Sequence, residues 1–144
     1  MIMTKIDFYI LSDANKQAAN LFVCKLIEKA YHLGHQIFVY CQSEEDAFEI
    51  DELLWSFEPC SFIPHNLQGE GPRQRPAIQI GYGQDAPGYQ DILINLSHHV
   101  PSFYGQFKRV CEIIPNQEEI KQLKRQCFRY YKEQKNAIKT HEIA

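Results

Sequence analysis

Short apolar runs alternate with amphipathic stretches over the first half of the chain, and this alternation predicts strands separated by helices. Residues 5–11 and 36–40 are rich in aromatic and branched side chains, as expected of buried strands. Between them, residues 16–33 place apolar side chains three and four positions apart, which predicts an amphipathic helix. A second helix is expected from Ser43 to about Trp55, because Ser43 can cap it and acidic residues fill its first turn.

The rest of the chain continues this pattern. Further strands are predicted at 77–82, 91–96 and 109–114, and a last helix from near Asn116 to about Gln134. Gly34 is placed to end the first helix. Strands that alternate with helices are typical of right-handed βαβ crossovers. We therefore predict a single α/β domain over residues 1–144, with three α/β/α layers, a mainly parallel sheet and Rossmann-like topology.

Such a fold suggests a nucleotide site at the carboxyl ends of the strands, but the sequence lacks the motifs for one. There is no GxxxxGK[ST] loop, and the first strand-to-helix turn, residues 12–15, contains no glycine that would let a phosphate approach the backbone. Gly81-Tyr82-Gly83 lacks the third glycine of a dinucleotide motif and reads as a turn. We expect no nucleotide site and no cofactor.

Catalytic and metal-binding motifs are also missing from the sequence. His98-His99 is an adjacent pair, and neighbouring side chains seldom aim at one metal ion; no HExxH or Cys/His ligand set accompanies it. No GxSxG elbow occurs, and the acidic residues between 44 and 52 have the spacing of a solvated helix face. We therefore predict a non-catalytic protein without a metal site.

Cysteine usage and hydropathy indicate the compartment. The five cysteines are scattered, with no CxxC spacing, and most lie in apolar runs, which fits free thiols in a reducing cytosol. No apolar run approaches the ~20 residues that a membrane span needs, and no signal peptide is evident. We expect a soluble, cytoplasmic protein.

Charge is unevenly distributed along the chain. Residues 121–144 carry a net charge of +5, whereas residues 1–120 carry −8, within a total of −3. On a helical projection the positive side chains of the last helix share one arc, at about 100–180° from Ile120: Lys121, Arg125, Arg129 and Lys132. An apolar stripe is predicted to pack on the sheet: Ile120, Leu123, Cys127, Tyr130, Tyr131 and Gln134. Phe128 falls between the two, so this face is either merely solvated or a socket for a peptide with an apolar end and a carboxylate.

A second unusual segment surrounds the single tryptophan. Trp55 ends the second predicted helix, and Phe62 and Pro64 follow in a segment too irregular for a core strand. Trp55 and Phe62 could present a rigid apolar surface to a partner or simply close the edge of the core. Composition alone leaves both interpretations open.

Several motifs resemble the chi subunit family of bacterial DNA polymerase III, in the same order along essentially the whole chain. They are Asp7-Phe8-Tyr9, Asp51-Glu52-Leu53-Leu54-Trp55, Ser61-Phe62-Ile63-Pro64-His65-Asn66-Leu67, Gly69-Glu70-Gly71-Pro72, Asp91-Ile92-Leu93-Ile94-Asn95-Leu96 and Lys121-Gln122-Leu123. The resemblance implies a non-catalytic adaptor of the clamp-loader assembly with a nucleotide-binding type of fold. One of its surfaces would hold the psi subunit, and another the acidic C-terminal tail of single-stranded DNA-binding protein, which ends in an apolar residue.

By position, the resemblance assigns residues to each surface. The tail socket would comprise Lys121, Lys124, Arg125, Phe128 and Arg129, with Ile114 lining it. The psi-facing surface would centre on Phe62, with Trp55, Pro64 and His65 nearby, and a helicase-like protein is an alternative partner there. Single-stranded DNA would be contacted only indirectly. Two rival functions stay open: direct binding of single-stranded DNA through the basic helix with Tyr130 and Tyr131 as stacking rings, and a nucleotide-binding enzyme.

Overall fold

A computed structural model describes residues 4–56, 63–68, 76–83 and 88–143. The strands are β1 (Lys5–Leu11), β2 (Ile37–Cys41), β3 (His65–Leu67), β4 (Ile78–Tyr82), β5 (Ile92–Asn95), β6 (Arg109–Ile114) and β7 (Ala137–Ile143). The α-helices are α1 (Lys16–His32), α2 (Glu44–Ser56) and α3 (Glu118–Glu133), and a short 3-10 helix spans Tyr104–Gln106. The described strands form one sheet in the order β3-β4-β2-β5-β6-β1-β7, and every pairing is parallel.

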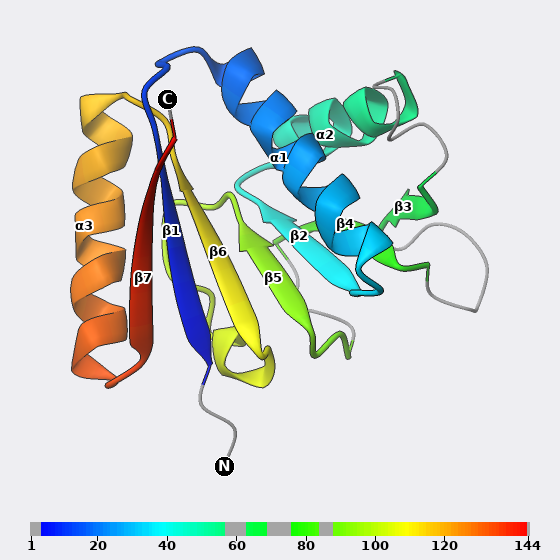
Figure 1. Cartoon of the computed structure of the whole chain (residues 1–144). Coiled ribbons are helices and arrows are strands. Elements are labelled where there is room, and N and C mark those ends of the chain that lie inside the picture. The colour runs from blue at the N-terminus through cyan, green and yellow to red at the C-terminus, as the bar shows by residue number, and fades with distance from the viewer. Residues whose placement is uncertain (1–3, 57–62, 69–75, 84–87, 144) are drawn as a thin grey trace.

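Helices lie on both faces of this sheet, which confirms the predicted three-layer α/β/α fold (Figure 1). Alternation along each strand sends side chains to opposite layers. On β2, Ile37 and Val39 join the core under α1 and α2, whereas Phe38 joins the core on the α3 side. The chain passes from β6 through α3 to β7, so α3 is packed over the end of the sheet formed by β6, β1 and β7 (Figure 1).

The helix ends follow from local chemistry, as the sequence predicted at Ser43 and Gly34. The Asn15 side chain accepts a hydrogen bond from the backbone N–H of Gln17 at 2.7 Å, and Ser43 Oγ accepts one from the N–H of Asp46 at 3.2 Å. These contacts satisfy N–H groups that have no partner within the helix. Gly34 follows α1 with φ of 89°, a conformation that costs glycine little.

Two strands were not predicted. β7 has an alternating but mostly exposed pattern with Lys139 and His141 in its centre, so it lacks the apolar run of a buried strand. Its pairing with β1 over residues 137–143 holds it at the edge of the sheet. β3 is a three-residue strand at the opposite edge. Among the described residues, no helix is long and apolar enough to cross a membrane.

Candidate functional site

The side of α3 that packs on the sheet is displaced from the predicted apolar stripe. Lys124, Cys127 and Tyr131 are its buried residues. Tyr130 and Gln134, which the predicted stripe included, are exposed. The prediction was wrong here because hydropathy did not anticipate that a lysine would face inward.

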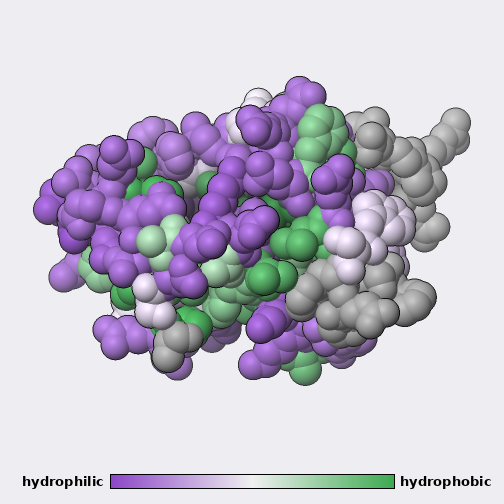
Figure 2. Space-filling view, turned by 90° about the horizontal axis from the view of Figure 1, so that it is seen from above, coloured by the Kyte–Doolittle hydropathy of each residue, from purple (hydrophilic) through white to green (hydrophobic). Residues whose placement is uncertain are grey.

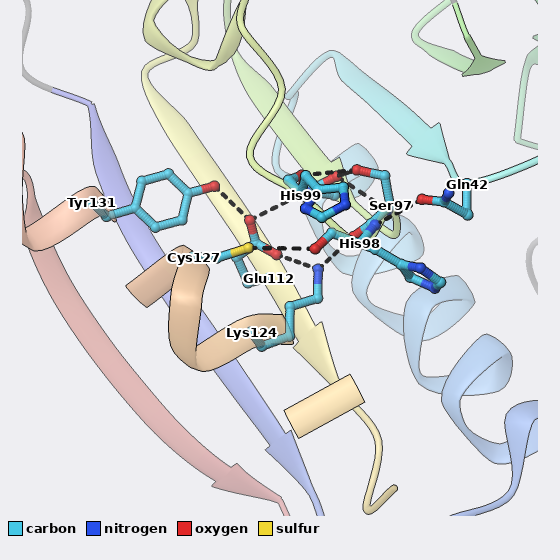
Figure 3. A network of polar contacts seen from close by, with 9 residues as sticks. Gln42, Ser97, His98, His99, Glu112, Lys124, Cys127 and Tyr131 are labelled. Carbon is cyan, nitrogen blue, oxygen red and sulfur yellow. Dashed lines mark hydrogen bonds and ion pairs between the residues drawn. The ribbon is translucent and has the colours of Figure 1, made fainter. Parts of the chain in front are cut away.

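A buried carboxylate explains this inward lysine (Figure 3). Glu112 on β6 is fully buried and lies 2.6 Å from Lys124 Nζ. Its second oxygen accepts hydrogen bonds from the Tyr131 hydroxyl at 2.5 Å and from Asn95 Nδ2 at 2.9 Å. Burial, followed by the nearby Glu112 charge, raises the pKa of Tyr131, so its hydroxyl stays protonated and donates. Lys124 Nζ also donates to the backbone oxygen of Ser97 at 2.7 Å.

Beside this network, a groove of about 350 Å³ opens between α3 and the strands β6, β1 and β7. We call it the basic groove. It is lined by Phe8, Ile10, Ile114, Thr140, Lys121, Lys124, Arg125 and Phe128. Phe128 packs edge-on against Phe8, with ring centroids 5.4 Å apart. The groove thus combines an apolar floor with cationic side chains from α3.

Five of the six residues predicted for the tail socket line this groove: Ile114, Lys121, Lys124, Arg125 and Phe128. Arg129 is exposed on α3 but does not line it. Phe8, Ile10 and Thr140 were not predicted to line a groove, because their position there depends on which strands flank α3. The alternation in β1, which sends Phe8 and Ile10 to one face, was the available signal.

The cations differ in how free they are to bind a ligand. Lys121 has no ion pair within the described part of the chain. Arg125 contacts Glu118 at 3.2 Å, and both side chains are more than half exposed, so this pair is weak and exchangeable. The Lys124 ammonium is already paired in the interior. Lys121 and Arg125 are therefore the groove's available charges.

The predicted psi-facing surface is partly described. Trp55, at the end of α2, is 60% exposed, so it does not close the core. Its ring lies over His65, with ring centroids 4.6 Å apart, and Pro64, the residue before His65, is exposed. His65 is itself buried, and its Nδ1 donates to the Ile63 carbonyl at 2.7 Å. The buried His65 ring therefore packs against the inner side of Trp55. Phe62 lies outside the described residues.

The carboxyl edge of the sheet, where a Rossmann enzyme would bind its nucleotide, holds a cavity of about 260 Å³. Figure 2 shows this edge from above, with apolar residues gathered between hydrophilic ones. Lys16 at the cavity is paired with Asp46 at 2.7 Å and with Glu49 at 3.2 Å, so an anionic ligand there would have to compete with two carboxylates. Within the described residues, no three His, Cys, Asp or Glu side chains form a group that could hold a metal ion.

Comparison with known proteins identifies related sequences over nearly the whole chain. Residues 3–139 match the family described as DNA polymerase III chi subunit, HolC. DNA polymerase III subunit chi of Pseudomonas aeruginosa is 36% identical over 141 residues, which cover 98% of each chain. The subunit chi of Escherichia coli K12 is 31% identical, covering 90% of this chain and 92% of its own. That of Haemophilus influenzae is 30% identical, covering 95% and 96%.

Proposed function

The chain belongs to the DNA polymerase III chi subunit family, and we propose that it acts there as a non-catalytic adaptor of the clamp-loader assembly. In this proposal the basic groove binds the acidic C-terminal tail of single-stranded DNA-binding protein. The surface around Trp55 binds the psi subunit. The protein thereby links the clamp loader to protein-coated single strands without reading a base.

The basic groove is the observation that carries this proposal. A tail with an apolar last residue, a free carboxylate and upstream acids needs an apolar pocket beside cations. Phe8, Ile114 and Phe128 supply the pocket, and Lys121 and Arg125 supply the cations. Guanidinium and ammonium groups form their strongest hydrogen bonds with carboxylates. Partly exposed charges also imply that affinity falls as salt rises.

The exposed ring of Trp55 supports the second contact. Large aromatic side chains at the surface are frequent anchors of protein interfaces, especially when their own position is fixed. Contact with His65 fixes Trp55, and the exposed Pro64 extends the apolar surface. We assign psi, or a competing helicase-like protein, to this surface together with Phe62.

Weak individual contacts suffice for such a tether. Single-stranded DNA-binding protein bound to DNA presents several tails, which raises the local concentration of ligand around each groove. Each dissociation is then followed by rapid rebinding to a neighbouring tail. The adaptor would hold the loader at the lagging strand while allowing exchange.

Direct binding of single-stranded DNA has less support. It would use Tyr130 and Tyr131 as stacking rings, but Tyr131 is fully buried and its hydroxyl donates a hydrogen bond to Glu112. Tyr130 alone, 43% exposed, is accessible for stacking.

Tail-deleted single-stranded DNA-binding protein separates the two functions. We expect the protein to bind DNA coated with the intact coat protein and to lose binding when only the tails are removed. Binding that survives tail deletion would contradict the tail-binding proposal and favour direct DNA binding. The same holds if the protein binds uncoated single-stranded DNA as tightly as it binds coated DNA.

A further inference from the structure

The ion pair of Glu112 and Lys124 lies at the wall of the basic groove, but it is directed into the protein. The two side chains are 0% and 2% exposed. Taking both charges out of water carries a large desolvation cost, which excellent geometry and further hydrogen bonds can offset. Those bonds come from Tyr131 and Asn95 to the carboxylate, and from the ammonium to the Ser97 carbonyl.

Lys124 separates two cavities. Its side chain lines the basic groove on one side and the apolar cavity at the carboxyl edge of the sheet on the other. Figure 3 shows the side chain reaching from α3 to Glu112 and Ser97. The groove therefore meets the methylene stem of Lys124, while the charge is held beneath α3 by its partners.

We infer that Glu112 is a specificity-determining positioning residue of the basic groove. By holding the Lys124 ammonium beneath α3, it keeps the groove floor apolar, so that the groove selects peptides whose last residue is apolar. Recognition of the carboxylate and of upstream acids is left to Lys121 and Arg125 at the rim. This inference rests on the proposed tail-binding function and deepens it.

Two roles of Lys124 can be distinguished by experiment. As a ligand-binding cation, it would contribute to affinity and to its salt dependence in the same way as Lys121. As the partner of Glu112, it contributes only the packing of its side chain to peptide binding. Its charge can then be removed together with that of Glu112 without loss of affinity. The double substitution Glu112→Gln/Lys124→Met does this, because the glutamine oxygen still accepts from Tyr131 and Asn95.

The single substitution Glu112→Gln removes the counter-ion and leaves the ammonium buried without its charged partner. Since an unpaired buried charge is costly, the Lys124 side chain is expected to turn toward the basic groove, which is more open to solvent than the other cavity that it lines. A charge in the groove would weaken the binding of a peptide with an apolar last residue and would strengthen the binding of a peptide with an acidic one. The variant should therefore change which peptide binds, beyond any loss of stability.

The test compares two synthetic peptides by fluorescence anisotropy over a range of salt concentrations. One copies the acidic tail with its apolar last residue, and the other replaces that residue by Asp. We expect Glu112→Gln/Lys124→Met to retain the wild-type affinity for the apolar-ended peptide within about threefold, with unchanged salt dependence. The control Lys121→Ala should lose roughly tenfold in affinity, and its affinity should depend less on salt. Glu112→Gln should narrow the preference for the apolar-ended peptide.

Each outcome decides the question. A double variant that loses as much affinity and salt dependence as Lys121→Ala would show that Lys124 is a ligand cation, which overturns the inference. A folded Glu112→Gln protein with wild-type preference would also overturn it, and if that variant does not fold the double variant decides alone. Failure of the wild-type protein to bind either peptide is a different result: it contradicts the proposed function itself, and the inference with it.

Discussion

Phe128 on α3 meets Phe8 on β1 edge-on, with their ring centroids 5.4 Å apart, and both rings line the basic groove. The contact ties the position of a ligand-facing ring to the first strand, about 120 residues earlier in the chain. Because Phe8 is buried on the sheet, Phe128 has a fixed support. The apolar end of the proposed ligand would therefore meet a preformed surface, and no ring would need to be ordered on binding.

Phe128→Ala should weaken binding of the acidic tail peptide by about tenfold or more, since it removes the aromatic wall of the groove. The fold should survive, as Phe128 is only partly buried. Titration of the peptide, with circular dichroism as the check on folding, measures this. Tyr130→Ala is the matched control, because Tyr130 is an exposed ring on the same helix that does not line the groove; equal losses in both variants would contradict the placement.

Glu118→Gln should strengthen tail binding. Glu118 contacts Arg125 and competes with an acidic ligand for its guanidinium, so removing the carboxylate frees that group. The gain should be small, about two- to threefold, because the pair is exposed. Calorimetric titration at low salt would detect it, and Glu133→Gln, an exposed acid at the far end of α3, is the control. Weaker binding by Glu118→Gln would show that Glu118 orients Arg125 for the ligand.

Trp55→Ala should abolish or strongly reduce binding of the psi subunit while leaving tail binding unchanged. Trp55 is 60% exposed and lies at the other end of the sheet order from α3, so its loss removes little from the core. Co-purification with psi and titration with the tail peptide report the two surfaces separately. Leu33→Ala, another exposed apolar side chain, controls for general loss of surface hydrophobicity. Unimpaired psi binding would remove Trp55 from that surface.

Cys41 and Cys111 should resist alkylation in the folded protein. Burial raises the pKa of each thiol to about 12, so at pH 8 both are protonated, and the reactive thiolate would form only as pH rises toward that value. Mass spectrometry after treatment with iodoacetamide, with and without denaturant, checks this. Labelling of either residue in the native protein at the rate of a free thiol would contradict the described packing.

The sequence predicted the layers and the groove's charges better than it predicted the groove's walls. Regular apolar spacing and helix caps such as Asn15 and Ser43 are local signals, so the predicted elements before α3 agree with the structure to within about two residues. β7 was missed because an exposed edge strand is stabilised by pairing with β1 and not by its own hydropathy. The basic groove depends on this strand, because Thr140 of β7 lines the groove.

No local feature of the sequence predicts the inward orientation of the Lys124 side chain. Hydropathy assigns lysine to the surface, and only the carboxylate of Glu112, on the strand before α3, turns it inward. The buried pair also explains why α3 is rotated relative to the predicted stripe. Such long-range pairing of charges requires the tertiary structure.

The most direct test of the account is titration of the purified protein with a peptide copying the tail of the host's single-stranded DNA-binding protein, at low and high salt, beside Arg125→Ala. We expect saturable binding that weakens as salt rises and that the substitution reduces by about tenfold, because an exposed guanidinium of the groove is removed. Absence of binding by the wild-type protein at low salt, or an affinity that neither salt nor the substitution changes, would contradict the basic groove as the tail-binding site.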